Sequence, residues 1–351
     1  MSESRKGTIE TPERLKFDEA KLDAYLAANI EDYAGPLSVK KFAGGESNPT
    51  YQLTTPGRKY VLRRKPPGKL LPSAHAVDRE HQIMTALGKQ GFPVPKTYLL
   101  CEDDDVIGTM FFVMDFLEGR TFWDWVIKEV PASARRDYFN AAIDNIATLH
   151  KFDPETVGLG DYGKPGNYFG RQIGRWTKQY QAAETDSHEN MNKLIEWLPT
   201  AIPDDEAVSI VHGDYKIDNL IFHPEEPLVI GTLDWELSTL GHPLADFGYF
   251  LMPWCLPQAT SMGYSDVDFA EMNLPTLDEA IGRYCDSTGR DGLPDINFCM
   301  AYSMFRLAGI VQGVYARALQ GNASSEKAKQ YGMFVPMLAN SGWAFAQKAG
   351  A

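Results

Sequence analysis

Three polar side chains, Asp214, Asn219 and Asp234, stand in a pattern that suits phosphoryl transfer. Asp214 and Asn219 are separated by four residues in HGDYKIDN, and Asp234 follows the apolar run LVIGTL. Apolar runs on either side predict short strands that leave the polar residues in loops. Phosphoryl transfer needs a carboxylate that orients an attacking hydroxyl, and oxygen ligands that hold Mg²⁺ against nucleotide phosphates. The pattern therefore predicts Asp214 as the catalytic base and Asn219 and Asp234 as metal ligands.

The motif H-G-D-x-x-x-x-N followed by L-D-W-E resembles the aminoglycoside phosphotransferase and choline kinase superfamily, which has a kinase-like fold. The runs HGDYKIDNLIFHP, VIGTLDWELSTLGHPLADFGYF and YVLRRKPPGKLLPSAHAVDRE are most similar to one branch. That branch is the kinase-like domain fused to some acyl-CoA dehydrogenases, with its free-standing bacterial relatives. The resemblance implies ATP and Mg²⁺ as cofactors and a functional link to an acyl-CoA dehydrogenase. It also implies a catalytic role for Lys216, whose plain alternative is a solvated surface lysine.

The first half of the chain supplies residues for a nucleotide. Gly44, Gly45 and Ser47 lie in a turn between two predicted strands, where glycines allow the backbone to approach phosphates closely. An ordinary hairpin turn is the alternative reading. The resemblance implies a cation on the third strand, and the aligned residue is Arg63. Lys65 lies on the same face two residues later, so the choice between them stays open.

Two further features belong to the nucleotide side of the resemblance. Glu80 matches the helix glutamate that pairs with the phosphate-binding cation. Met114, Asp115 and Phe116 resemble the hinge that connects the two lobes, where backbone groups would meet the adenine edge. Met114 and Phe116 would flank the adenine ring, although an ordinary core strand fits the same sequence.

The acceptor side is less clearly marked. Glu236 follows Asp234 by two residues and is a candidate for a second metal or the substrate. Arg171 and Arg175 share a predicted helix with aromatic residues and would favour an anionic acceptor if they face the cleft. Arg306 stands in an apolar helical run, which makes it a candidate acceptor contact.

Three functions remain in competition at this point. The branch with the strongest resemblance implies a small-molecule hydroxyl acceptor that is a hydroxyacyl or hydroxyacyl-CoA compound. An aminoglycoside- or choline-type kinase is the second reading. A nucleotide-binding pseudokinase or scaffold is the third, and the presence of Asp214, Asn219 and Asp234 together argues against it.

The elements that would position these residues change in kind along the chain. Strands are predicted at residues 37–42, 51–55, 59–65, 97–102 and 109–116, with an accessory helix at 17–30 and an inserted helix at 73–87. Helices are predicted at 133–151, 169–183 and 189–198 and from residue 244 onwards, around a strand-rich segment at 209–234. The expected fold is α+β and bilobal, protein-kinase-like, with a five-stranded antiparallel N-lobe at 1–116 and a mostly helical C-lobe at 117–351.

Composition narrows the function classes further. The net charge of −13 over 351 residues argues against a role in non-specific nucleic-acid binding. The four cysteines form no CxxC pair and no zinc spacing, which favours reduced thiols. The chain shows neither the apolar core of a signal peptide nor an apolar run of about 20 residues. These features predict a cytoplasmic protein with no membrane partner.

Overall fold

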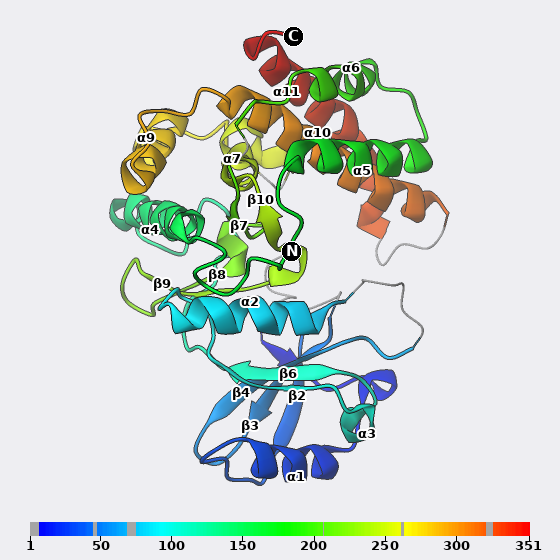
Figure 1. The fold of residues 1–351 in the computed structure, drawn as a ribbon, viewed down its shortest axis with the longest axis vertical. Helices are drawn as coiled ribbons and strands as arrows, with labels where there is room; N and C mark the ends of the chain where they lie inside the picture. Colours follow the sequence, from blue (N-terminus) through cyan, green and yellow to red (C-terminus); the bar gives the residue numbers. More distant parts are fainter. Residues whose placement is uncertain (1–6, 45–47, 69–74, 206, 261–262, 321–325) are drawn as a thin grey trace. The chain divides into compact units, whose positions relative to one another are not determined.

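The computed structural model describes residues 7–44, 48–68, 75–205, 207–260, 263–320 and 326–351 (Figure 1). The chain forms two compact units that alternate along the sequence. The first unit comprises the residues up to Asp124 together with Val157–Leu159 and Ile217–Ser238, and the second comprises the remainder. Asn219 and Asp234 therefore belong to the unit that holds the N-terminal sheet, whereas Asp214 belongs to the other. The single division after residue 116 stays a prediction.

The first unit is built on a six-stranded antiparallel sheet with the order β1-β2-β3-β4-β6-β5. Its strands are β1 (Thr8–Ile9), β2 (Ser38–Phe42), β3 (Thr50–Thr54), β4 (Lys59–Arg64), β5 (Thr97–Cys101) and β6 (Phe111–Asp115). The five predicted strands are present, and β1 extends the sheet at the edge beside β2. A strand of two residues is too short to leave an alternating pattern in the sequence.

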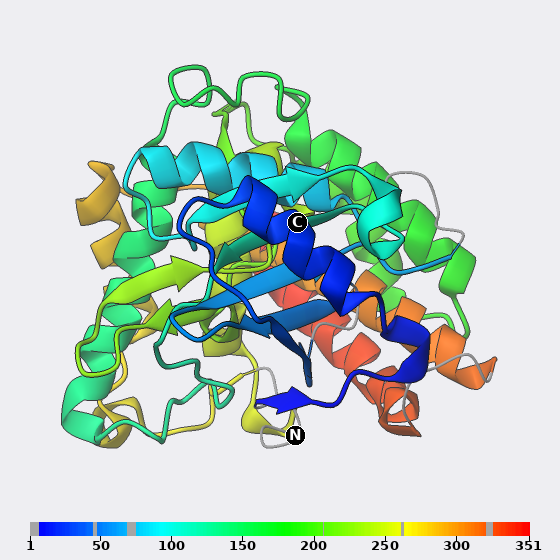
Figure 2. The same cartoon turned by 90° about the horizontal axis from the view of Figure 1, so that it is seen from below.

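The two faces of this sheet are covered by different helices. Figures 1 and 2 show α1 (Glu19–Asn29) across one face and α2 (Val77–Lys89) along the other. Because side chains alternate along a strand, Leu62 of β4 packs in a buried core with Leu22 of α1, while Arg63 faces α2. Strand alternation thus directs the guanidinium of Arg63 towards the helix that carries Glu80.

A second, smaller hairpin in the first unit carries the other two polar residues. Its strands are β8 (Leu220–Phe222) and β9 (Val229–Thr232), preceded by η4 (Ile217–Asn219) and followed by η5 (Trp235–Leu237). Leu220 pairs with Thr232, and the Leu233 N–H donates to the Asn219 carbonyl at 2.9 Å. Asn219 and Asp234 consequently lie together at the open end of the hairpin.

The second unit is mostly helical. Its helices are α4 (Ala132–Lys151), α5 (Tyr168–Ala183), α6 (Glu189–Trp197), α7 (Pro243–Leu251), α8 (Phe269–Met272), α9 (Leu277–Thr288), α10 (Ile296–Leu319) and α11 (Phe334–Lys348). Most side chains of α10 are buried, and the helix packs against α5, α7 and α11. A two-stranded ribbon of β7 (Ser209–Val211) and β10 (Thr239–Gly241) carries the HGD segment. In the part of the chain that the structure describes, no helix combines the length and apolar character needed to cross a membrane.

Candidate active site

The guanidinium of Arg63 joins three carboxylates of the first unit. Its Nε lies 2.9 Å from Oε2 of Glu80, and its Nη2 lies 2.7 Å from Oδ1 of Asp234 and 3.8 Å from Oε2 of Glu236. Burial alone would lower the pKa of Arg63, but these three carboxylates raise it, so the arginine stays charged. We call these four residues the Arg63 cluster. Arg63 is thus surrounded by three carboxyl groups, and burial raises the pKa of the Glu80 carboxyl to about 7 although the charge of Arg63 lowers it.

Glu80 is held from a second side within the same cluster. Its carboxylate is almost fully buried and accepts a hydrogen bond from Nδ2 of Asn48 at 2.9 Å, in addition to the contact with Arg63. Lys65, the alternative cation, lies 3.7 Å from Asp78 on a more exposed part of the surface. Of the two cations proposed from the sequence, Arg63 is the one that pairs with Glu80.

The open end of the β8–β9 hairpin carries Asn219 and Asp234, whose side chains contain oxygen donors. Asp234 adopts a left-handed backbone with φ of 67°, a conformation that costs free energy in a residue other than glycine and is enriched at functional sites. Among the described residues, no group of three or more His, Cys, Asp and Glu side chains is arranged to hold a metal. Two oxygen donors suit Mg²⁺, which usually takes its remaining ligands from substrate phosphates and water. The carboxylates of Asp234 and Glu236, which lie beside Arg63, also favour a divalent cation.

In the second unit, Asp246 of α7 holds the backbone of the segment His212–Asp214, which we call the HGD loop. Its carboxylate accepts the N–H of His212 at 2.7 Å and that of Gly213 at 2.8 Å, and it lies 3.3 Å from Nε2 of His150. Burial would raise the pKa of Asp246, but His150 and His212 outweigh burial and hold it below its usual range. Asp246 therefore holds the backbone immediately before Asp214 in place.

Asp214 has polar neighbours in the second unit that include Lys216 and Tyr249. Nζ of Lys216 lies 3.1 Å from its Oδ2. Burial and the negative charge of Asp214 raise the pKa of the Tyr249 phenol. Sequence reasoning missed Tyr249, because a tyrosine in an apolar helix has the same pattern as a core aromatic residue.

The side chain of Arg306, in α10, contacts a backbone carbonyl of the HGD loop. Its Nη2 donates to the Gly213 carbonyl at 2.5 Å, and the side chain is 6% exposed. The guanidinium lies 4.8 Å from the ring centre of Tyr249 and 5.7 Å from that of Trp176. The acceptor contact expected of Arg306 stays a prediction, whereas its contact with the loop is observed.

Comparison with known proteins decides the family. Residues 38–279 match the model described as the phosphotransferase enzyme family. The chain belongs to this family. The resemblance inferred from the HGD and LDWE motifs is therefore confirmed.

Two curated relatives of this phosphotransferase-family chain belong to longer proteins. Acyl-CoA dehydrogenase family member 10 of Mus musculus is 42% identical over 332 residues, covering 94% of this chain and 31% of that protein. Acyl-CoA dehydrogenase family member 11 of Gallus gallus is 43% identical over 345 residues, covering 96% of this chain and 44% of that protein. The chain thus spans less than half the length of either relative.

Solved structures extend the comparison to three dimensions. A Ralstonia eutropha protein described as a candidate aminoglycoside phosphotransferase shares 45% identity with a TM-score of 0.88, covering 95% of this chain and 99% of that one. An aminoglycoside phosphotransferase in complex with AMP-PNP and hygromycin B shares 12% identity with a TM-score of 0.62, covering 94% and 100%. At that identity the likeness shows the fold alone, and the predicted α+β kinase-like fold is confirmed.

In this phosphotransferase-family chain, the turn predicted to approach the nucleotide phosphates contains Gly44, Gly45 and Ser47. Gly45 and Ser47 lie outside the described residues, and the Gly44 carbonyl accepts a hydrogen bond from Lys41 at 3.1 Å. A Cβ added to Gly44 would meet no atom within 4 Å, so packing does not require a glycine there.

The hinge residues predicted from the sequence lie at the end of β6. Met114 is buried, and the Asp115 carboxylate accepts hydrogen bonds from Arg58 at 2.8 Å and from Tyr98 at 2.5 Å. The Phe116 ring stacks on Phe42 at 6.4 Å between ring centres. The side chain of Asp115 thus joins residues next to β4 and in β5 at the end of β6, and contact of the hinge with an adenine stays a prediction.

The two arginines of α5 are engaged locally. Arg171 donates to the carbonyls of Gly166 and Lys164, in the loop that precedes the helix. Arg175 is exposed and lies 5.6 Å from the ring centre of Trp176. Arg171 thus holds the loop before α5 in place. A role in acceptor binding stays a prediction for both arginines.

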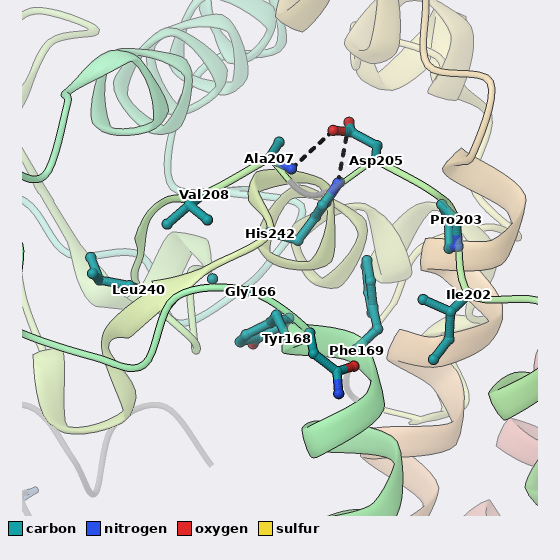
Figure 3. Close-up of a pocket in the computed structure, with 12 residues that line it drawn as sticks. Gly166, Tyr168, Phe169, Ile202, Pro203, Asp205, Ala207, Val208, Leu240 and His242 are labelled. Carbon is teal, nitrogen blue, oxygen red and sulfur yellow. Dashed lines mark hydrogen bonds and ion pairs between the residues drawn. The ribbon is translucent and has the colours of Figure 1, made fainter.

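A cavity of about 130 Å³ lies in the second unit beside the residues that precede β7 (Figure 3). Tyr168, Phe169, Asp205 and Leu240 line it, together with His242, whose Nε2 lies 3.4 Å from the Asp205 carboxylate. Nδ1 of His242 caps α7 by accepting the Leu244 N–H, and burial lowers the pKa of its imidazole. Asp214 follows the other end of β7, so the cavity is separate from the HGD loop.

Proposed function

We propose that the chain is an ATP-dependent phosphotransferase that moves the γ-phosphate to a hydroxyl of a small molecule. Membership of the phosphotransferase enzyme family supports this reaction class. The observation that carries the proposal is the Arg63 cluster, in which Arg63 pairs at once with Glu80 and with Asp234. These are the positions at which the family resemblance implies a phosphate-binding cation, its helix partner and a metal ligand.

Arg63 would bind the nucleotide phosphates, and Glu80 and Asn48 would hold its guanidinium in place. Asn219 and Asp234 would hold Mg²⁺, which supplies positive charge to the phosphates when it is bound. The phosphate-covering turn would include Gly44, Gly45 and Ser47. Backbone groups of Met114, Asp115 and Phe116 would meet the adenine.

Asp214 would orient the acceptor hydroxyl and take its proton as the new O–P bond forms and the bond to the ADP oxygen breaks. Lys216, 3.1 Å from the Asp214 carboxylate, would place positive charge near the transferred phosphoryl group. The transfer is direct, so it requires no phosphorylated form of the protein.

We infer a hydroxyacyl or hydroxyacyl-CoA compound as the acceptor. The support is the 42–43% identity to acyl-CoA dehydrogenase family members over nearly the whole chain, which also supports a functional link to such a dehydrogenase. Glu236, Arg171 and Arg175 are the proposed acceptor contacts, whereas Arg306 contacts the loop that carries Asp214. An aminoglycoside-type acceptor is the second candidate, since it is favoured by the description of the Ralstonia eutropha protein.

A screen of ATP consumption tests the reaction and the acceptor together. The acceptors are hydroxyacyl-CoAs, free hydroxy acids, aminoglycosides and choline, each with Mg²⁺ and with Asp214→Asn as the inactive control. We expect turnover with the hydroxyacyl set. Turnover confined to the cationic set would reverse the order of acceptors. If no acceptor consumes ATP and calorimetry finds no nucleotide binding, the phosphotransferase assignment is wrong and the scaffold reading is favoured.

A further inference from the structure

The two backbone polar groups of Gly213, its N–H and its carbonyl, are both bound by side chains that are distant in the sequence. Its N–H donates to Asp246 of α7 at 2.8 Å, and its carbonyl accepts from Arg306 of α10 at 2.5 Å. Gly213 has φ of 83°, a left-handed conformation that favours glycine. The backbone immediately before Asp214 is therefore determined by a carboxylate and a guanidinium that belong to two different helices.

Arg306 is itself held rigidly. It lies in the buried part of α10, between the rings of Tyr249 and Trp176. A guanidinium stacks well on aromatic faces, and its planar donors have fixed directions, so this packing aims Nη2 at the Gly213 carbonyl. A lysine would lack both the plane and the fixed donor geometry.

Tyr249 connects the same arginine to Asp214 by a second route. Its ring lies against the Arg306 guanidinium, and the negative charge of Asp214, together with burial, raises the pKa of its phenol. Arg306 thus binds Gly213, the residue before Asp214, through a hydrogen bond. It also packs against Tyr249, whose phenol has Asp214 as a charged neighbour. Burying a charge is costly unless polar partners compensate for it, and here the compensation comes from the HGD loop.

We propose that Arg306 is a positioning residue, which fixes the Gly213 peptide and Tyr249 and thereby aligns the Asp214 carboxylate for the acceptor hydroxyl. This inference rests on the proposed function, because alignment matters only if Asp214 acts as the base. It differs from a direct acceptor contact, which would make Arg306 a determinant of acceptor binding instead.

The first experiment compares Arg306→Lys and Arg306→Met with Arg317→Met, an exposed arginine of the same helix, as matched control. With an acceptor that the wild type phosphorylates, we expect Arg306→Lys to lower kcat by about 10- to 100-fold, because displacements of about 1 Å at a reacting group have effects of that size. The KM values for ATP and acceptor should change by less than about threefold. An increase confined to the acceptor KM, with kcat unchanged, would overturn the proposal in favour of direct binding.

Hydrogen exchange supplies a readout that does not depend on turnover. In Arg306→Met, the amides of the segment 209–216 should exchange at least about tenfold faster than in wild type, since the anchor of the loop carbonyl is lost. The Arg317→Met control and segments such as α4 should be unchanged. If the amides of 209–216 exchange at the same rate in Arg306→Met as in wild type, the proposal is overturned, even when no acceptor is phosphorylated. If exchange at 209–216 is faster in Arg306→Met but neither wild type nor any variant turns over, Arg306 does hold the loop. Only the phosphotransferase function is then refuted.

Discussion

The Arg63 cluster of the first unit and the Gly213 peptide of the second unit organise their polar groups in opposite ways. At Gly213 each backbone group has a dedicated partner, Asp246 for the N–H and Arg306 for the carbonyl. In the Arg63 cluster, one guanidinium serves Glu80, Asp234 and Glu236. Both backbone groups of Gly213 are thus bound by side chains, whereas the Arg63 cluster gathers three carboxyl groups around one cation, and burial raises the pKa of the Glu80 carboxyl to about 7. The difference suggests that the second unit holds a base in position and the first is built to accept cations and phosphates.

The comparison makes Asp214 the residue whose loss should have the largest effect. Asp214→Asn removes the proton acceptor but leaves the Gly213 peptide and its two partners in place. We expect kcat to fall by about 10²- to 10⁴-fold, the usual contribution of a general base, while nucleotide affinity changes by less than about twofold. Steady-state kinetics and calorimetry measure the two. Asp204→Asn, an exposed change of the same kind, is the control, and unchanged turnover in Asp214→Asn would remove the base from the mechanism.

Removing the support of the loop should chiefly affect stability. Asp246→Ala leaves two buried N–H groups without their acceptor, at about 1–3 kcal/mol each, so we expect a loss of about 2–6 kcal/mol at pH 7. Urea unfolding followed by circular dichroism measures the free energy of unfolding. A loss below about 0.5 kcal/mol would contradict a complete and rigid environment at Gly213.

Asp246→Ala also tests how the stabilisation that Asp246 provides changes with pH. The folded protein holds the pKa of Asp246 below its usual range, so its stabilisation is present above the unfolded pKa of about 3.9 and is lost as pH falls through the folded value. The difference in unfolding free energy between wild type and Asp246→Ala should therefore be constant from pH 7 to about pH 5. This difference in unfolding free energy should become smaller at more acidic pH. A difference that grows as the pH falls would contradict a lowered pKa for Asp246.

Metal dependence should distinguish the first unit from the second. Asp234→Ala removes a predicted Mg²⁺ ligand and one partner of Arg63, so the gain in nucleotide affinity that Mg²⁺ provides should fall by about 10- to 100-fold. Calorimetric titration of ATP with Mg²⁺ and with EDTA measures this gain. Asp246→Asn, in the other unit, should retain it. Equal losses in both variants would show that the two regions do not divide the work as their charges suggest.

The smallest expected effects concern the two cations of the sheet. Arg63→Lys keeps the charge but loses the forked donors that join Glu80 and Asp234, and we expect the KM for ATP to rise by about tenfold. Lys65→Met removes a charge that lies 3.7 Å from Asp78 alone, and the KM should change by less than about twofold. Kinetics at saturating acceptor decide between them. The reverse order would make Lys65 the phosphate-binding residue.

The sequence anticipated most of the features that depend on local order. Alternation in residues 59–65 predicted β4 and placed Arg63 and Lys65 on one face, and the apolar runs around HGDYKIDN predicted the short strands. The choice of Arg63 as the partner of Glu80 came from the structure, because both cations share that face and only the position of α2 separates them. β1 was missed because two residues carry no periodic signal.

What the sequence determined by itself is the chemical inventory and the family: the order and spacing of Asp214, Asn219 and Asp234, and the motifs around them. The tertiary structure alone decided the partners of Gly213. Arg306 lies 93 residues along the chain from the carbonyl that it binds, and neither periodicity nor composition encodes a contact made by packing two helices around a loop. An arginine in an apolar helix indicates that a polar partner exists, because burying an unpaired charge is costly, but only the fold identifies that partner.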